Sequence, residues 1–151
     1  LSLVCNAAYI HSRVRFEEGA PERDRPLAGQ SPYLVNAGLF YQHDDKRIFA
    51  SLLYNRIGKR IESVGVPMQD QNEDIPDIYE MPRNSLDLTF SKKIGKAVEI
   101  KAGIQDMLNS KIEYKQFVKL TDQNGGKRER EQLVRSYRPG VDINVGVSLK
   151  F

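Results

Sequence analysis

Hydrophobic and polar residues alternate along the last stretch of the chain. In VDINVGVSLKF (141–151) every odd-numbered residue is apolar, and every even-numbered residue is polar or glycine. Successive side chains of a β-strand point to opposite faces, so a period of two predicts a strand with one apolar face.

Five segments upstream repeat this alternation, two of them with apolar residues out of phase. They are LSLVCNAAYI (1–10), YLVNAGLFYQ (33–42), IFASLLYN (48–55), NSLDLTFS (84–91) and AVEIKAGIQ (97–105). No stretch has a convincing helical period. The sequence therefore predicts an all-β chain with six strands.

The connections between these segments alternate in length. Residues 44–46 and 92–95 predict tight hairpin turns, whereas 17–30, 61–81 and 117–138 predict long polar loops. Outer-membrane barrels have short periplasmic turns and long external loops, while nothing forces this separation in a soluble sandwich. The pattern favours an antiparallel membrane barrel, with residue 151 at the periplasmic rim.

Aromatic residues fall near both ends of the predicted strands, as the two interfacial belts of a membrane barrel require. Those beside the short turns or the last strand's end are Tyr41, Phe49, Phe90 and Phe151, and those toward the long loops are Tyr9, Tyr33, Tyr54, Tyr114 and Tyr137.

The cost of charge in lipid decides which face of these strands should meet the membrane. An Arg or Lys on the lipid side near the midplane costs about 2 to 4 kcal/mol. The polar face is therefore expected to point into the lumen, the interior of the barrel. The lumen-facing residues predicted in this way are Asp87, Glu99, Lys101, Asp142, Asn144 and Lys150.

Six strands alone leave two unpaired edges, and each unsatisfied backbone group in hydrocarbon costs several kcal/mol. The smallest usual membrane barrel has about eight strands. We therefore expect these six to belong to a larger closed sheet. The sequence has no initiator Met and opens within a strand, so its true N-terminus is expected to lie elsewhere.

Composition adds few constraints. The 23 Lys and Arg are interleaved with 20 Asp and Glu, which disfavours nucleic acid as a partner. The single cysteine, Cys5, cannot form an internal disulfide and is interpreted as a small apolar residue of its strand. No apolar run reaches the ~20 residues of a membrane helix.

No motif of a known catalytic chemistry occurs, so we expect no enzyme, no cofactor and no metal site. His11 and His43 are interpreted as strand residues, because no other metal ligands stand at zinc-site spacing. The oxygen-rich stretches DQNED (70–74) and DQNGG (122–126) lack the full ligand spacing of a calcium loop and are interpreted as solvated loops.

Four stretches resemble the C-terminal end of a TonB-dependent outer-membrane receptor. They are RPLAGQSPYLVNAGLFYQ (25–42), ASLLYNRIGKRI (50–61), YEMPRNSLDLTFSKKIGKAVEIKAGIQDMLNSKIEY (79–114) and YRPGVDINVGVSLKF (137–151). The resemblance implies a barrel of about 22 strands, of which this chain supplies about the last six. It also implies import of a scarce solute (a glycan, a peptide or a metal chelate) across the outer membrane of a Gram-negative bacterium.

The resemblance implies several partners. These are outer-membrane lipid, the remaining strands and plug of the same barrel, and an inner-membrane energy-coupling complex of the TonB type that acts through the plug. A further implied partner is the barrel-assembly machinery, which reads the alternate apolar residues of the last strand: Ile143, Val145, Val147, Leu149 and Phe151. The KRERE stretch (127–131) is a candidate contact for a surface lipoprotein or lipopolysaccharide, although hydration of a loop explains its mixed charges better.

Two other interpretations remain open. The chain is a complete eight-stranded outer-membrane barrel with a structural or adhesive role if two further alternating segments occupy 61–76 and 117–133. Alternatively it is a soluble ligand-binding β-barrel or sandwich, in which the apolar faces pack into a core.

Overall fold

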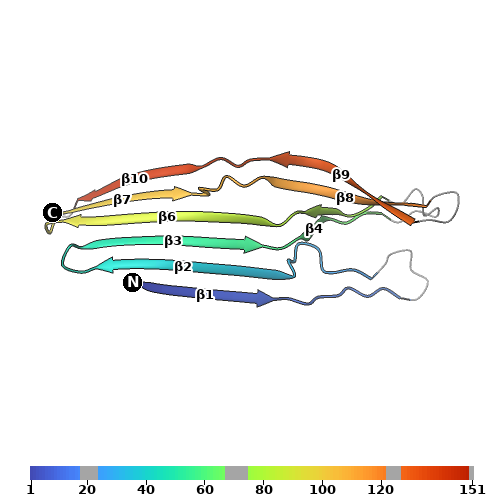
Figure 1. Cartoon of the computed structure of the whole chain (residues 1–151), viewed down its shortest axis with the longest axis horizontal. Helices are drawn as coiled ribbons and strands as arrows, with labels where there is room; N and C mark the ends of the chain where they lie inside the picture. The colour runs from blue at the N-terminus through green and yellow to red at the C-terminus, as the bar shows by residue number, and fades with distance from the viewer. Residues whose placement is uncertain (18–23, 67–74, 122–126, 150–151) are drawn as a thin grey trace.

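The computed structural model describes residues 1–17, 24–66, 75–121 and 127–149 of the chain, and all their regular structure is antiparallel β-sheet (Figure 1). The described part contains no helix of the length and apolar character that a membrane crossing requires. The ten strands are β1 (Ser2–Tyr9), β2 (Tyr33–His43), β3 (Ile48–Ile57), β4 (Arg60–Ser63), β5 (Ile78–Glu80), β6 (Arg83–Ile94), β7 (Val98–Gln105), β8 (Ile112–Thr121), β9 (Lys127–Tyr137) and β10 (Asp142–Leu149).

Two sheets contain these strands. The larger has the order β1-β2-β3-β6-β7-β10, and the smaller has the order β4-β5-β8-β9. Figure 1 shows β8 beyond the end of β7 and β9 beyond the start of β10, so the smaller sheet extends the larger one lengthwise. Only a few residues separate β3 from β4, β5 from β6, β7 from β8 and β9 from β10. The chain is therefore an up-and-down meander of six long runs, and each predicted segment coincides with a strand of the larger sheet.

Neither sheet closes on itself. β1 and β10 form the two margins of the larger sheet and do not pair with each other. The prediction of antiparallel all-β structure is thus confirmed, while a closed barrel is not formed by the strands that the structure describes.

Two of the three predicted long loops are wrong in part. The 61–81 stretch contains most of β4 and all of β5, and the 117–138 stretch contains the end of β8 and all of β9. β4 and β5 are too short to show a hydrophobic period, and β9 begins with charged residues. β8 does alternate, with Ile112, Tyr114, Val118 and Leu120 apolar against Glu113, Lys115 and Lys119, but the predicted loop boundary at 117 divides this pattern. The four strands extend the six runs and add no further run, which is not the arrangement expected of a complete eight-stranded barrel.

The short turns lie at the end of the larger sheet that is farther from the smaller sheet. Residues 44–47 form the first turn, in which the Arg47 N–H donates to the Asp44 carbonyl at 3.0 Å. The second turn occupies 95–97 and not 92–95, because β6 continues to Ile94 before Gly95 adopts a left-handed φ of 61°. The two turns are adjacent, since the Lys93 N–H donates to the Arg47 carbonyl at 3.0 Å.

Two Asx residues form the break between β7 and β8. Asp106 and Asn109 have left-handed φ values of 51° and 42°, a conformation that Asp and Asn tolerate better than most residues. The side-chain oxygen of Asn109 accepts a hydrogen bond from the Gly140 N–H at 3.1 Å. The backbone carbonyl of Asn109 accepts another from the Arg138 guanidinium at 2.8 Å. These two hydrogen bonds join the break between β7 and β8 to the break between β9 and β10.

The larger sheet is a single layer. Every substantial contact between strands joins hydrogen-bonded neighbours, so no second layer of the described chain covers either face. Among the described residues the buried apolar side chains are Ile61, Ile112 and Tyr114, all in the smaller sheet. By contrast Val145, at the centre of β10, is 73% exposed. The larger sheet has no core of its own.

Candidate functional site

One face of the larger sheet is apolar across all six strands. Directly paired residues of antiparallel strands place their side chains on the same face. The pairing register therefore defines rows of side chains that cross the sheet. The central row contains only Leu and Ile: Leu3, Leu39, Leu52, Leu88, Ile104 and Ile143.

The rows on either side of this central row carry no charge. Toward the short turns lie Tyr41, Ala50, Phe90, Ala102 and Val145. Toward the smaller sheet lie Cys5, Ala37, Tyr54 and Leu86. We call these three rows the apolar band. Cys5, the one cysteine, is exposed within it and forms no disulfide.

Polar side chains bound the apolar band at both ends. His43 and Lys92 lie in the next row toward the short turns, and Arg56 and Asn84 lie in the next row toward the smaller sheet. Lys92 and Asn84 are eight positions apart on β6. At a rise of about 3.3 Å per residue this is about 26 Å along the strand.

Tyrosines gather at the end of the apolar band nearer the smaller sheet. Tyr9 and Tyr33 are cross-strand partners. The Tyr54 hydroxyl and an Arg56 N–H both donate to the Asn84 side-chain oxygen at 2.9 Å. Tyr54 thus presents an apolar ring to the band and a hydroxyl to its polar boundary, as the aromatic residues of a membrane interface do, and Tyr9 and Tyr33 lie one row beyond that boundary.

The aromatic belt predicted at the short turns is only partly formed. Tyr41 and Phe90 lie on the apolar face, but Phe49 pairs with Gln42 and Ser91 on the opposite face. Phe49 is one residue out of phase with its neighbours, so strand parity turns it away from Tyr41. Phe151 lies outside the described residues.

Two other tyrosines of the predicted belts lie in the smaller sheet. The Tyr114 and Tyr137 rings stack at 6.4 Å, with the Arg135 guanidinium 4.1 Å from the Tyr114 ring centroid. Tyr114 and Tyr137 are therefore farther from the short turns than Tyr54 is.

The opposite face of the larger sheet is mostly polar, and we call it the polar face. It holds five of the residues that the sequence predicts to face a lumen, and the sixth, Lys150, lies outside the described residues. The five are Asp87, Glu99, Lys101, Asp142 and Asn144. The residues predicted as an assembly signal lie on the apolar face: Ile143, Val145, Val147 and Leu149.

Hydrogen bonds connect strands on the polar face, and one ion pair lies within β7. Asn55 donates to Asn36, and Asn36 donates to Asn6 at 2.7 Å, so three amides form a ladder across β1, β2 and β3. Lys101 lies 3.5 Å from the Glu99 carboxylate. A small apolar patch interrupts this face at Gly38, where a Cβ atom would lie 2.7 Å from the Phe40 ring.

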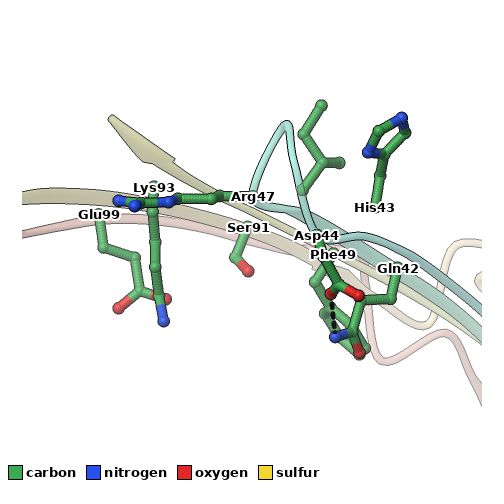
Figure 2. A pocket seen from close by; sticks show the side chains of 9 residues that line it. Gln42, His43, Asp44, Arg47, Phe49, Ser91, Lys93 and Glu99 are labelled. Carbon is green, nitrogen blue, oxygen red and sulfur yellow. Dashed lines mark hydrogen bonds between the residues drawn. The ribbon is translucent and has the colours of Figure 1, made fainter. Parts of the chain in front are cut away.

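A shallow open groove of ≈ 460 Å³ lies on the polar face beside the short turns. Figure 2 shows Phe49, Ser91 and Glu99 on one side of the sheet and His43 on the other. Gln42 donates to the Asp44 carboxylate at 2.6 Å within this groove. Its mixture of charges and one aromatic ring forms no recognisable catalytic arrangement.

The smaller sheet has charges on both faces. On one, Arg60 donates through two nitrogens to the Glu80 carboxylate at 2.9 and 2.7 Å, next to Tyr114. On the other, the Lys59 ammonium lies 3.8 Å from the Phe117 ring centroid and 4.1 Å from that of Tyr79. No continuous apolar face exists in the described strands of this sheet.

An ion pair joins β8 and β9 on that second face. Lys115 lies 2.5 Å from the Glu131 carboxylate, and the hydrogen bond to Glu131 raises the pKa of Lys115. Glu131 and Arg128 to Arg130 belong to the KRERE stretch, which is therefore strand β9 and not a loop. The DQNED and DQNGG stretches lie outside the described residues.

The described residues contain no group of three or more side chains arranged to hold a metal ion. His43 is the last residue of β2, whereas His11 follows the end of β1, so the strand assignment of His11 is wrong. The site is thus a two-faced sheet, apolar on one side and polar on the other. Comparison with protein-family models, with curated proteins and with solved structures finds no match for this chain.

Proposed function

We propose that this chain supplies the last strands of a TonB-dependent receptor in the outer membrane of a Gram-negative bacterium. One observation carries the proposal: the apolar band crosses all six strands of the larger sheet, and no other described strand packs on it. The sequence resemblance to such receptors supports the same assignment.

The lengths of the strands that carry the apolar band fit a bilayer. Membrane strands need about 9 to 11 residues and tilt by about 45°. β2, β3 and β6 have 11, 10 and 12 residues. An outward apolar band about 25 Å tall, flanked by aromatic girdles, is typical of outer-membrane barrels. The tyrosines near Asn84, together with Tyr41 and Phe90, would form parts of these girdles.

A soluble sandwich or barrel explains the apolar band less well. In such folds the apolar face of each sheet packs against a second layer or across a closed interior. Contiguous apolar patches on soluble monomers are rarely larger than a few hundred Å². An apolar face with a central row across six strands and two flanking rows across five and four, on which no described residue packs, is more stable against lipid than against water.

The unpaired edges of β1 and β10 in the described sheet are evidence for further strands beside them. Open sheet edges do not occur in hydrocarbon, because unpaired N–H and C=O groups there have no partners. In the proposed receptor, strands outside the described residues pair with both edges and complete a barrel of about 22 strands. A complete eight-stranded barrel is less well supported, because the described strands form six runs and not eight, and β1 and β10 do not pair with each other.

In this arrangement the polar face lines the lumen, which the receptor's plug domain occupies and through which the imported solute passes. The smaller sheet continues the runs beyond the membrane and shapes the outer mouth, because its two charged faces suit water on both sides. A surface lipoprotein is a further candidate partner at this mouth. The alternate apolar residues of β10, with Phe151, would serve the barrel-assembly machinery.

Uptake measurements test the proposed import. We expect a strain without this protein to lose uptake of one solute class among glycans, peptides and metal chelates. Deleting the energy-coupling complex should abolish the same uptake, and restoring the whole protein should return it. Uptake that persists without the coupling complex would contradict the receptor and favour the small barrel.

A further inference from the structure

Basic residues gather at the short-turn end of the larger sheet. We call this group the basic rim, and its members are all exposed: Lys46, Arg47, Lys92, Lys93 and Lys96. Two hydrogen bonds join the turns there. The Arg47 guanidinium donates to the Gly95 backbone carbonyl at 2.5 Å, and the Lys93 backbone N–H donates to the Arg47 backbone carbonyl. Cations from two hairpins are therefore fixed beside one another.

Lys92 is the member of the basic rim that lies on the apolar face. Its cross-strand neighbours are Ile48 on β3 and Ile100 on β7, and Phe90 lies two residues before it. No carboxylate of the described residues forms an ion pair with Lys92. Sequence alternation alone would have placed an apolar residue at this position.

The acidic residues nearby are Asp44, Asp45 and Glu99, three carboxylates against the five cations of the rim, and Asp45 is exposed in the first turn. Asp44 is held by Gln42 in the groove on the polar face, and Glu99 lines the same groove with Lys93 (Figure 2). His43 lies on the apolar face and accepts a hydrogen bond from the Lys46 N–H at 3.3 Å. Positive charge therefore dominates where the apolar band ends.

A lysine next to an apolar surface keeps its stem on that surface and its ammonium in a polar layer. In a bilayer the nearest polar layer beyond the acyl chains contains the lipid phosphates. We infer that the basic rim, with Lys92 at its centre, binds the headgroups of anionic phospholipids in the adjacent leaflet. This inference rests on the proposed membrane placement and adds a lipid preference to it.

Native mass spectrometry with defined lipids tests the inference. The whole native protein is purified in detergent, mixed with phosphatidylglycerol or phosphatidylcholine, and the lipid molecules retained on the folded protein are counted. Lys92→Gln should lower the preference for phosphatidylglycerol about fivefold, the usual effect of one cation near an anionic bilayer surface. Lys92→Arg should retain it.

Lys111→Gln is the matched control, because it removes the same charge from an exposed position in the break between β7 and β8, at the opposite end of the larger sheet from the basic rim. It should leave the lipid preference unchanged. Equal effects of Lys92→Gln and Lys111→Gln would overturn the headgroup site alone, provided that the protein inserts into pure phosphatidylcholine vesicles. Failure to insert into those vesicles would overturn the membrane placement as well.

Discussion

A charge placed at the centre of the apolar band should destabilise the protein by a depth-dependent amount. Leu88 lies four residues from Lys92 and four from Asn84 on β6, so it marks the middle of the band. Its cross-strand partners are Leu52 and Ile104, which offer no counter-ion. In the proposed membrane placement, Leu88→Arg therefore exposes an unpaired guanidinium to the deepest lipid.

The expected cost of Leu88→Arg is about 2 to 4 kcal/mol of unfolding free energy, the value for Arg near the bilayer midplane. Ile94→Arg, at the last residue of the same strand, should cost about 0 to 1 kcal/mol, because the interface hydrates the charge. Thr89→Arg is the matched control, since Thr89 is exposed on the polar face one residue away.

Guanidinium unfolding of the whole protein in phosphatidylcholine vesicles measures these three values. If the apolar face met water, Leu88→Arg would change the stability by no more than about 0.5 kcal/mol, as surface substitutions do. A cost for Leu88→Arg no larger than that for Thr89→Arg, or no larger than that for Ile94→Arg, would refute the placement of the band in lipid.

Two further predictions address the faces and the smaller sheet. These 151 residues have no tryptophan, so Val145→Trp and Asn144→Trp each add one reporter on one face of β10, and its quenching is the difference from the unmodified whole protein. Brominated acyl chains should quench the fluorescence of Trp at 145 strongly and at 144 weakly, and equal quenching would contradict the assignment of the faces. In the smaller sheet, Glu131 raises the pKa of Lys115 above its usual 10.5, so the pair stabilises the fold fully below that pH and less as the pH rises through the raised pKa. The melting temperature should therefore fall more steeply above about pH 10.5 in the unmodified protein than in Glu131→Gln, and parallel curves would show that the pair contributes nothing.

The sequence by itself determined the strands of the larger sheet and the division of their side chains between two faces. Alternation is a local property, because each strand residue points opposite to its neighbour whatever the strand pairs with. For that reason Leu88, Ile104 and Val145 could be assigned to one face, and Asp87 and Glu99 to the other, before any pairing was known. The position of Phe49 also follows from its parity, although its nearness to a turn suggested a different role.

Only the tertiary structure decided what lies between and beside these strands. β4 and β5 are too short to show a hydrophobic period, and β9 begins with five charged residues, so the pairing of their backbones defines these three strands. β8 alternates, but its pattern alone did not separate its second half from a polar loop. The row from Leu3 to Ile143 likewise depends on a register set by hydrogen bonds between residues far apart in the chain. The same long-range pairing placed Lys92 between two isoleucines, and it left β1 and β10 as open margins.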